Sequence, residues 1–399
     1  MFMNDLHYDV VVVGAGPSGS TTARFAARNG ARTLIIEKRQ EIGSPVRCGE
    51  GISRFWLDEV ELSLDKKWYA WQVKGARVIS PSKHTLVIDE KRAGNEVGFV
   101  LERDKFDKGL AALAVKEGAE IMLKTTAIDV LKENGYVKGV KARHWGETFN
   151  IYAKIVVAAD GYESQIGRWA GFDTKLKAND IISCFQYRLT NIELNPDFCD
   201  FYLGRCYAPG GYIWVFPKDE ETANVGIGIQ LKQLKEKGEP KKVLDKWIKS
   251  TKEFAKGQPL EEVAGAVSIS QPLEKTVDNG IMLVGDAARM IDPVTGGGIA
   301  NGCRAGKVCG IVAAESIQSK DYSSEFLQKY EQGWRKLLEE QLYRNWLVKE
   351  KLVTLSDETI DMMIQTAIEI GVEHLSTKSI LDAIKKKHPE LVKEFEEFL

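Results

Sequence analysis

Two polar side chains in glycine-rich segments could exchange a proton with a substrate. Cys48 lies in Arg47-Cys48-Gly49-Glu50-Gly51, and Tyr212 lies in the segment from Pro209 to Pro217, which reads PGGYIWVFP. A thiol or a phenol can act as a general acid when a pocket holds it beside a reacting atom. The alternative is that Cys48 only packs in its loop and that Tyr212 only shapes the pocket.

Three aromatic residues of the second segment alternate along the chain. Tyr212, Trp214 and Phe216 therefore share one face if the segment is a β-strand. A core face usually mixes β-branched residues with aromatic ones, whereas this face is wholly large and flat. Such a wall suits a long apolar or isoprenoid ligand. The candidate substrate residues are Pro209, Tyr212, Trp214, Phe216 and Pro217.

The elements that would position this chemistry begin at the N-terminus. Residues 8–13 form a β-branched run typical of a buried parallel strand, and the G-x-G-x-x-G turn of Gly14, Gly16 and Gly19 follows it. A helix over 21–29 and a strand over 33–36 come next, and the strand ends at Glu37. The turn and the helix N-terminus can bind a pyrophosphate, and the acid is spaced to accept hydrogen bonds from a ribose. The sequence predicts a dinucleotide site here.

Two later acid–glycine pairs indicate which dinucleotide this is. Buried strands end at Asp160-Gly161 and at Gly285-Asp286, and the triple glycine 296–298 opens a helix over about 299–316. With the N-terminal turn, these motifs resemble the p-hydroxybenzoate hydroxylase-type FAD fold. The resemblance implies that Asp286 holds a ribitol hydroxyl and that Arg103 lies against the FAD. A helix start aimed at the flavin N1–C2=O edge would stabilise the anionic reduced flavin.

The Cys48 segment and the aromatic segment together resemble the geranylgeranyl reductase family, most closely its archaeal members that act on ether lipids. The resemblance covers nearly the whole chain and implies FAD-dependent saturation of geranylgeranyl chains. It also implies FAD contacts near Cys48, Gly49, Gly51 and Ala127. The candidate cofactor-binding residues are Gly14, Gly16, Pro17, Ser18, Gly19, Glu37, Lys38, Arg47, Cys48, Gly49, Gly51, Arg103, Ala127, Asp160, Gly161, Asp286, Gly297, Gly298 and Ile299.

The isolated alkenes of a prenyl chain are poor hydride acceptors. We hypothesise net hydride delivery from flavin N5, with proton donation from Cys48 or Tyr212 and stabilisation of cationic character by the aromatic ring faces. An FAD-dependent aromatic monooxygenase or halogenase on the same fold is the alternative enzyme. A prenyl-binding chaperone without turnover is the alternative from another class, and the complete FAD motifs argue against it.

Composition limits the partners. The 399 residues carry 55 basic and 57 acidic side chains, so charge offers no case for nucleic acid. The scattered histidines and the absence of a C-x-x-C pair argue against a metal site. No second dinucleotide motif is visible, so an external electron donor is expected: ferredoxin, reduced deazaflavin or NAD(P)H. We expect a cytoplasmic protein, for which a lipid substrate makes peripheral contact with the inner face of the membrane reasonable.

The expected fold is α/β, or α+β overall. A Rossmann-type FAD-binding domain comprises residues 1–77, 98–179 and 276–330, and an inserted antiparallel-sheet substrate domain comprises 78–97 and 180–275. Residues 331–399 form a helical C-terminal region, with one apolar helix face after Ser356 and a second apolar stripe after Pro389. Cys199 and Cys206 could pair across a turn or remain free thiols.

Overall fold

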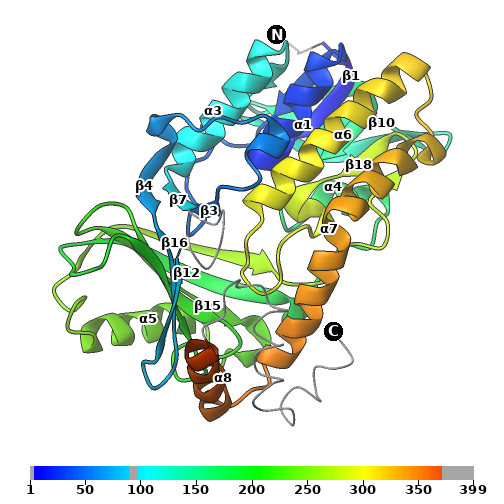
Figure 1. Ribbon diagram of the computed structural model, residues 1–399. Coiled ribbons are helices and arrows are strands. Elements are labelled where there is room, and N and C mark those ends of the chain that lie inside the picture. Colours follow the sequence, from blue (N-terminus) through cyan, green and yellow to red (C-terminus); the bar gives the residue numbers. More distant parts are fainter. Residues whose placement is uncertain (1–3, 90–97, 371–399) are drawn as a thin grey trace.

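The computed structural model describes residues 4–89 and 98–370, which form two large sheets with helices around them and one small sheet between them (Figure 1). The C-terminal stripe expected after Pro389 lies outside the described residues. The first sheet has a parallel core because its strands are β-branched runs that are buried on both faces. Val10, Val11 and Val12, for example, are fully buried.

Eight strands make up the first sheet. Its main path runs in the order β17 (Val277–Asp278), β18 (Ile281–Leu283), β11 (Glu147–Ala158), β1 (Leu6–Val13), β2 (Thr33–Ile36) and β8 (Glu120–Met122). The pairs from β18 to β8 are parallel, and β17 joins β18 antiparallel. An antiparallel meander branches from β11 through β10 (Tyr136–His144) to β9 (Thr125–Glu133).

Three helices pack side by side against this sheet. Helix α1 (Pro17–Arg28) contacts both α3 (Arg103–Lys116) and α6 (Ile299–Ser319). Gly306 and Gly310 permit the close approach of α6, because a Cβ at Gly310 would lie 2.3 Å from the carbonyl oxygen of Thr22. The short helix α4 (Gln165–Ala170) packs near β9. Short 3₁₀ turns occur at Asp58–Val60, Lys66–Trp68, Ala178–Asp180, Leu231–Gln233 and Gly285–Ala288.

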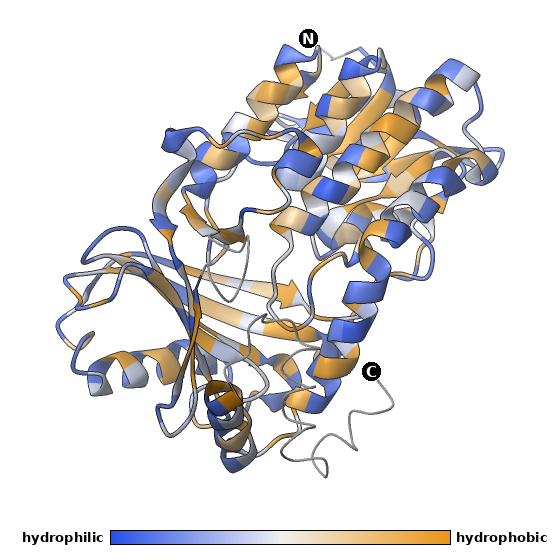
Figure 2. Ribbon diagram, in the orientation of Figure 1, coloured by the Kyte–Doolittle hydropathy of each residue, from blue (hydrophilic) through white to orange (hydrophobic). Residues whose placement is uncertain are grey.

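The second sheet has seven strands and is mainly antiparallel. Its order is β16 (Gln258–Ser268), β12 (Ile181–Thr190), β15 (Ala223–Gln230), β14 (Tyr212–Pro217), β13 (Phe198–Leu203), β5 (Gly75–Ile79) and β6 (Thr85–Asp89), with β13 and β5 parallel. One face packs on helix α5 (Glu239–Ser250) through alternating residues such as Ile213, Val215 and Ile227. The hydrophobic residues in Figure 2 follow these strands.

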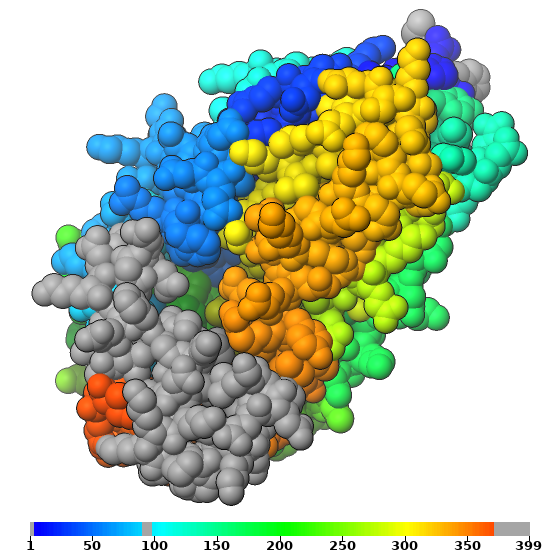
Figure 3. Space-filling model, turned by 45° about the vertical axis from the view of Figure 1, so that its right-hand side comes forward, coloured from blue at the N-terminus to red at the C-terminus, as the bar shows by residue number. Residues whose placement is uncertain are grey.

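A small sheet and two C-terminal helices connect the large sheets. The small sheet contains β3 (Gly51–Ser53), β7 (Gly98–Leu101) and β4 (Tyr69–Val73). Helix α7 (Ser324–Leu352) starts beside α6 and runs down to the second sheet, as the orange band in Figure 3 shows. Helix α8 (Asp357–Ile370) packs on β6, and its apolar face begins after Ser356 as predicted.

Two of the expected domain limits fall inside elements of the structure, one in a strand and one in a helix. The limit between 77 and 78 falls inside β5, which pairs with the second sheet along its whole length, so we move it to Lys74. The limit between 330 and 331 falls inside α7. Cys199 and Cys206 are both free thiols. Among the described residues, no helix is long and apolar enough to cross a membrane.

Candidate functional site

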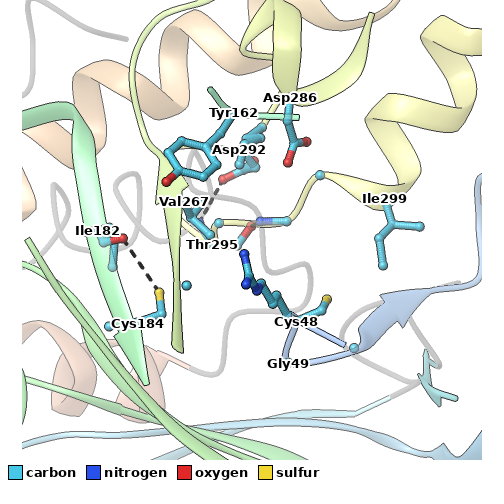
Figure 4. Close-up of a pocket in the computed structure, with 18 of the residues that line it drawn as sticks. Cys48, Gly49, Tyr162, Ile182, Cys184, Val267, Asp286, Asp292, Thr295 and Ile299 are labelled. Atoms are coloured by element: carbon cyan, nitrogen blue, oxygen red, sulfur yellow. Dashed lines mark hydrogen bonds between the residues drawn. The ribbon is translucent and has the colours of Figure 1, made fainter. Parts of the chain in front are cut away.

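A cavity of about 1660 Å³ extends from the glycine turn after β1, past the Cys48 segment and the second sheet, to α7 and α8. This volume exceeds the range of roughly 300–1,000 Å³ that is usual for one small-molecule site, so the cavity can hold more than one ligand. Figure 4 shows Cys48 and Gly49 on one side of it and Cys184 of β12 on another. Asp286 and Asp292 lie on the side opposite Gly49, with Thr295 in the middle.

The glycine turn is shaped by two close backbone approaches. Gly14 has a φ of +109°, and a Cβ there would lie 2.3 Å from the carbonyl oxygen of Ala159. A Cβ at Gly19 would lie 2.0 Å from the carbonyl oxygen of Gly14, so Gly19 serves the packing of α1 on β1. The Glu37 carboxylate accepts hydrogen bonds from the backbone N–H of Ala15 at 3.0 Å and of Arg39 at 2.9 Å. The acid therefore fixes the edge of the predicted nucleotide site.

Two half-buried acids in the cavity fit a polyhydroxy ligand. Asp160 accepts a hydrogen bond from the backbone N–H of Ile166 at 2.9 Å, while its buried Oδ1 has no partner among the described residues. Burial raises the pKa of Asp286, and the charge of Arg103 opposes this shift. Buried polar atoms usually have partners, so an unpaired carboxylate oxygen in a cavity indicates a ligand hydroxyl. These residues fit FAD as the sequence motifs predicted.

The cavity face of the second sheet forms rows across β14, β15 and β12. Tyr212, Gly228 and Cys184 are in register in one row, and Trp214, Gly226 and Gln186 form the next. A Cβ at Gly226 would lie 2.2 Å from the Trp214 ring, so this glycine lets the indole lie across β15. Phe201 of β13 packs edge-on against Tyr212 and Phe216 at ring distances of 5.4 and 5.2 Å. The three predicted aromatic residues thus form a continuous wall.

The two candidate proton donors differ in their surroundings. Burial raises the pKa of the Cys48 thiol, and the nearby Arg103 guanidinium opposes this shift. The Cys48 Sγ accepts a hydrogen bond from the backbone N–H of Glu50 at 3.2 Å. The Tyr212 hydroxyl donates to the carbonyl oxygen of Thr295 at 2.5 Å, and burial raises its pKa as well. Cys48 therefore stays protonated near neutral pH, whereas the Tyr212 hydroxyl already donates its proton in a hydrogen bond to a backbone carbonyl.

The Cys48 segment is held in place by a buried charge cluster. Glu50, only 1% exposed, has a φ of +75°. Its carboxylate accepts hydrogen bonds from Lys218 at 2.6 Å, from Asn224 at 2.6 Å and from the backbone N–H of Arg103 at 2.7 Å. Arg188 lies 3.5 Å from the same carboxylate. Side chains of β12 and β15, together with Lys218 directly after β14, thereby hold the segment that carries Cys48.

Most of the predicted site residues line this one cavity. Gly19, Pro209 and Pro217 do not: Gly19 packs on Gly14, and the prolines end the aromatic segment. Arg103 reaches the cavity while its guanidinium pairs with Asp107 at 2.7 and 2.8 Å. The residues that line the cavity as predicted are Gly14, Gly16, Pro17, Ser18, Glu37, Lys38, Arg47, Cys48, Gly49, Gly51, Arg103, Ala127, Asp160, Gly161, Tyr212, Trp214, Phe216, Asp286, Gly297, Gly298 and Ile299.

Sequence reasoning missed Gln186, Glu50, Lys218 and Asn224, as well as the wall that α8 contributes. One signal was present: β12 alternates apolar residues with Cys184, Gln186 and Arg188, and this pattern marks a polar inner face. Within the described ranges, no cluster of three metal-ligating side chains occurs.

Comparison with known proteins identifies this arrangement. A family model described as the geranylgeranyl reductase catalytic domain matches residues 180–267, and one described as FAD dependent oxidoreductase matches residues 9–205. A digeranylgeranylglycerophospholipid reductase of Thermoplasma acidophilum is 51% identical, covering 98% of this chain and 99% of its own. The chain belongs to the geranylgeranyl reductase family. A relative of the same name from Picrophilus torridus is 48% identical over 99% of this chain and 100% of its own.

Solved structures agree with this assignment to the geranylgeranyl reductases. A geranylgeranyl bacteriochlorophyll reductase-like protein from Thermoplasma acidophilum superposes with a TM-score of 0.95 at 50% identity, covering 99% of this chain and 100% of its own. A flavin-dependent brominase superposes with a TM-score of 0.72 at 18% identity, which shows a shared fold only. The predicted fold class, the predicted family and FAD as the cofactor of this reductase are confirmed.

Proposed function

We propose that the protein is an FAD-dependent reductase that saturates the geranylgeranyl chain double bonds of archaeal ether lipid precursors, namely digeranylgeranylglyceryl phosphate or a later phospholipid. The observation that carries the proposal is the continuity of the cavity. One end is lined by the FAD motifs, the middle by Tyr212, Trp214 and Phe216, and the far end by apolar residues of α8 such as Met363 and Ile364. A long apolar chain can therefore lie against the wall with an alkene beside the cofactor.

Reduced FAD would supply a hydride equivalent to one alkene carbon. We assign the proton for the other carbon to Cys48, because burial keeps its thiol protonated and it lines the cavity. Tyr212 orients the glycine-rich loop through its hydrogen bond to Thr295 and presents its ring to the chain. The apolar wall excludes water from the reacting alkene and favours cationic character by its ring faces.

The partners follow from this assignment. The substrate is an isoprenoid ether lipid, and the electrons come from an external donor, for which ferredoxin, reduced deazaflavin and NAD(P)H remain the candidates. The protein works in the cytoplasm, in peripheral contact with the inner face of the cell membrane, where its lipid substrate resides. Addition of anionic lipid vesicles should sediment part of the protein with the vesicles.

The test of this function is an anaerobic turnover. The purified holoenzyme is reduced with dithionite, mixed with digeranylgeranylglyceryl phosphate, and followed by flavin absorbance and by lipid mass. Flavin reoxidation with mass gains in steps of two hydrogens supports the reductase. A flavin that stays reduced until air is admitted would instead favour the monooxygenase or halogenase alternative. Cys48→Ala holoenzyme that still matches the wild type in single turnovers would remove Cys48 from the mechanism.

A further inference from the structure

We propose that Gln186 is a positioning residue that couples the aromatic wall of the cavity to the segment that carries Cys48. The inference rests on the proposed function, in which the wall holds the prenyl chain and Cys48 supplies the proton. Gln186 is 5% exposed and lies on the cavity face of β12, between the two groups that it would connect.

The register of the second sheet brings these groups together. Gln186 pairs with Gly226 across β12 and β15, and Trp214 pairs with Gly226 across β15 and β14. Because Gly226 has no side chain, the Trp214 indole crosses β15 and reaches the strand beyond it. Any larger residue at 226 would separate the indole from Gln186. Gly226 is therefore required for the contact between Trp214 and Gln186.

The carboxamide of Gln186 uses both of its ends. Its Oε1 accepts a hydrogen bond from the Trp214 Nε1–H at 2.7 Å, and its Nε2 donates to the carbonyl oxygen of Cys48 at 3.1 Å. An indole N–H can only donate and a carbonyl can only accept, so the two partners allow a single orientation of the amide. This bridge sets the position of the Cys48 backbone relative to the ring that the prenyl chain touches.

The neighbouring row supports the same segment in a different way. The Asn224 side chain donates to the Gly49 carbonyl at 3.1 Å as well as to Glu50, and among the described residues it makes no side-chain hydrogen bond to an aromatic residue of the wall. Of the described side chains that bond to the Cys48 segment, Gln186 alone also has a side-chain hydrogen bond to the aromatic wall. Loss of its amide should thus loosen Cys48 and leave Glu50 in place.

The test compares Gln186→Met with Gln230→Met in the FAD-loaded enzyme. Gln230 is a matched control: it lies in the same sheet, is 3% exposed, and donates to the carbonyl oxygen of Asn179 at 2.7 Å. Two quantities are measured: the rate of Cys48 alkylation by iodoacetamide, mapped by mass spectrometry with the exposed Cys206 as internal reference, and kcat and KM for lipid reduction.

In Gln186→Met, iodoacetamide should alkylate Cys48 about five- to tenfold faster, which is the factor that the loss of one buried hydrogen bond implies. The substitution should lower kcat by a similar factor, with little change in KM. Gln230→Met should match the wild type in both. Equal alkylation and equal kcat in the two variants would overturn the proposal.

A second variant keeps the proposal testable if Gln186→Met does not fold. Trp214→Phe retains a ring but removes the N–H that orients the amide, so it should also speed Cys48 alkylation. A double variant should add little to either single change if the residues form one unit, and full additivity would overturn the coupling. If the wild type did not reduce the lipid, the proposed function would fail, while the alkylation rates would still decide the coupling.

Discussion

Lys218→Met should destabilise the protein because it removes the nearer of the two cations that face the buried carboxylate of Glu50. Lys218 and Glu50 are 6% and 1% exposed and lie 2.6 Å apart. Removal of one partner of a buried ion pair costs about 3–5 kcal/mol. Arg188 still faces Glu50 at 3.5 Å, and Asn224 and the Arg103 backbone N–H still bond to it. We therefore expect the lower end of this range, about 3 kcal/mol, which is more than a hundredfold in the unfolding equilibrium. Urea denaturation at a fixed FAD concentration, followed by tryptophan fluorescence, measures the change.

Two further variants make this reasoning refutable. The double variant Glu50→Gln/Lys218→Met also removes the buried negative charge that has lost its nearer cation, so it should be more stable than Lys218→Met alone. Lys74→Met breaks an exposed pair with Asp197, in which the lysine side chain is 70% exposed, and should cost less than about 1 kcal/mol. The reasoning fails if Lys218→Met costs no more than Lys74→Met, or if the double variant loses the sum of the two single changes.

Two other predictions concern the cofactor end of the cavity. Gly14→Ala places a Cβ 2.3 Å from the Ala159 carbonyl oxygen at a φ of +109°, so the variant should purify without FAD, as seen from its visible absorbance; a yellow variant with wild-type FAD content would contradict this. Burial and the Glu50 carboxylate raise the pKa of Cys48. The rate of Cys48 alkylation should therefore increase at a higher pH than the rate for glutathione. Glu50→Gln should shift this increase to lower pH. A profile at or below that of glutathione would show that the thiol is not shielded.

Local patterns were sufficient for the cofactor site. The strand, glycine turn, helix and terminal acid from residue 8 to Glu37 follow one another directly in the chain, so their spacing predicts their order and arrangement. The predicted helix start was wrong: α1 begins at Pro17 and not at residue 21, because proline fits the first turn of a helix. The helix after the triple glycine begins at Ile299, as expected. The alternation of Tyr212, Trp214 and Phe216 likewise placed all three on one strand face, because side chains in a strand alternate whatever lies around them.

Only the tertiary structure determined what these residues face. Gln186, Lys218 and Asn224 are ordinary polar residues in separate strands, and no local spacing connects them with Cys48, Gly49 or Glu50, more than 130 positions earlier in the chain. Their contacts depend on strand order and register, which are fixed by long-range pairing and by the burial of one sheet face on α5. The sequence by itself therefore determined the cofactor turn and the aromatic face. The packing of the Cys48 segment on the second sheet decided how the thiol is held, because it brings distant polar groups into a buried space where each must find a partner.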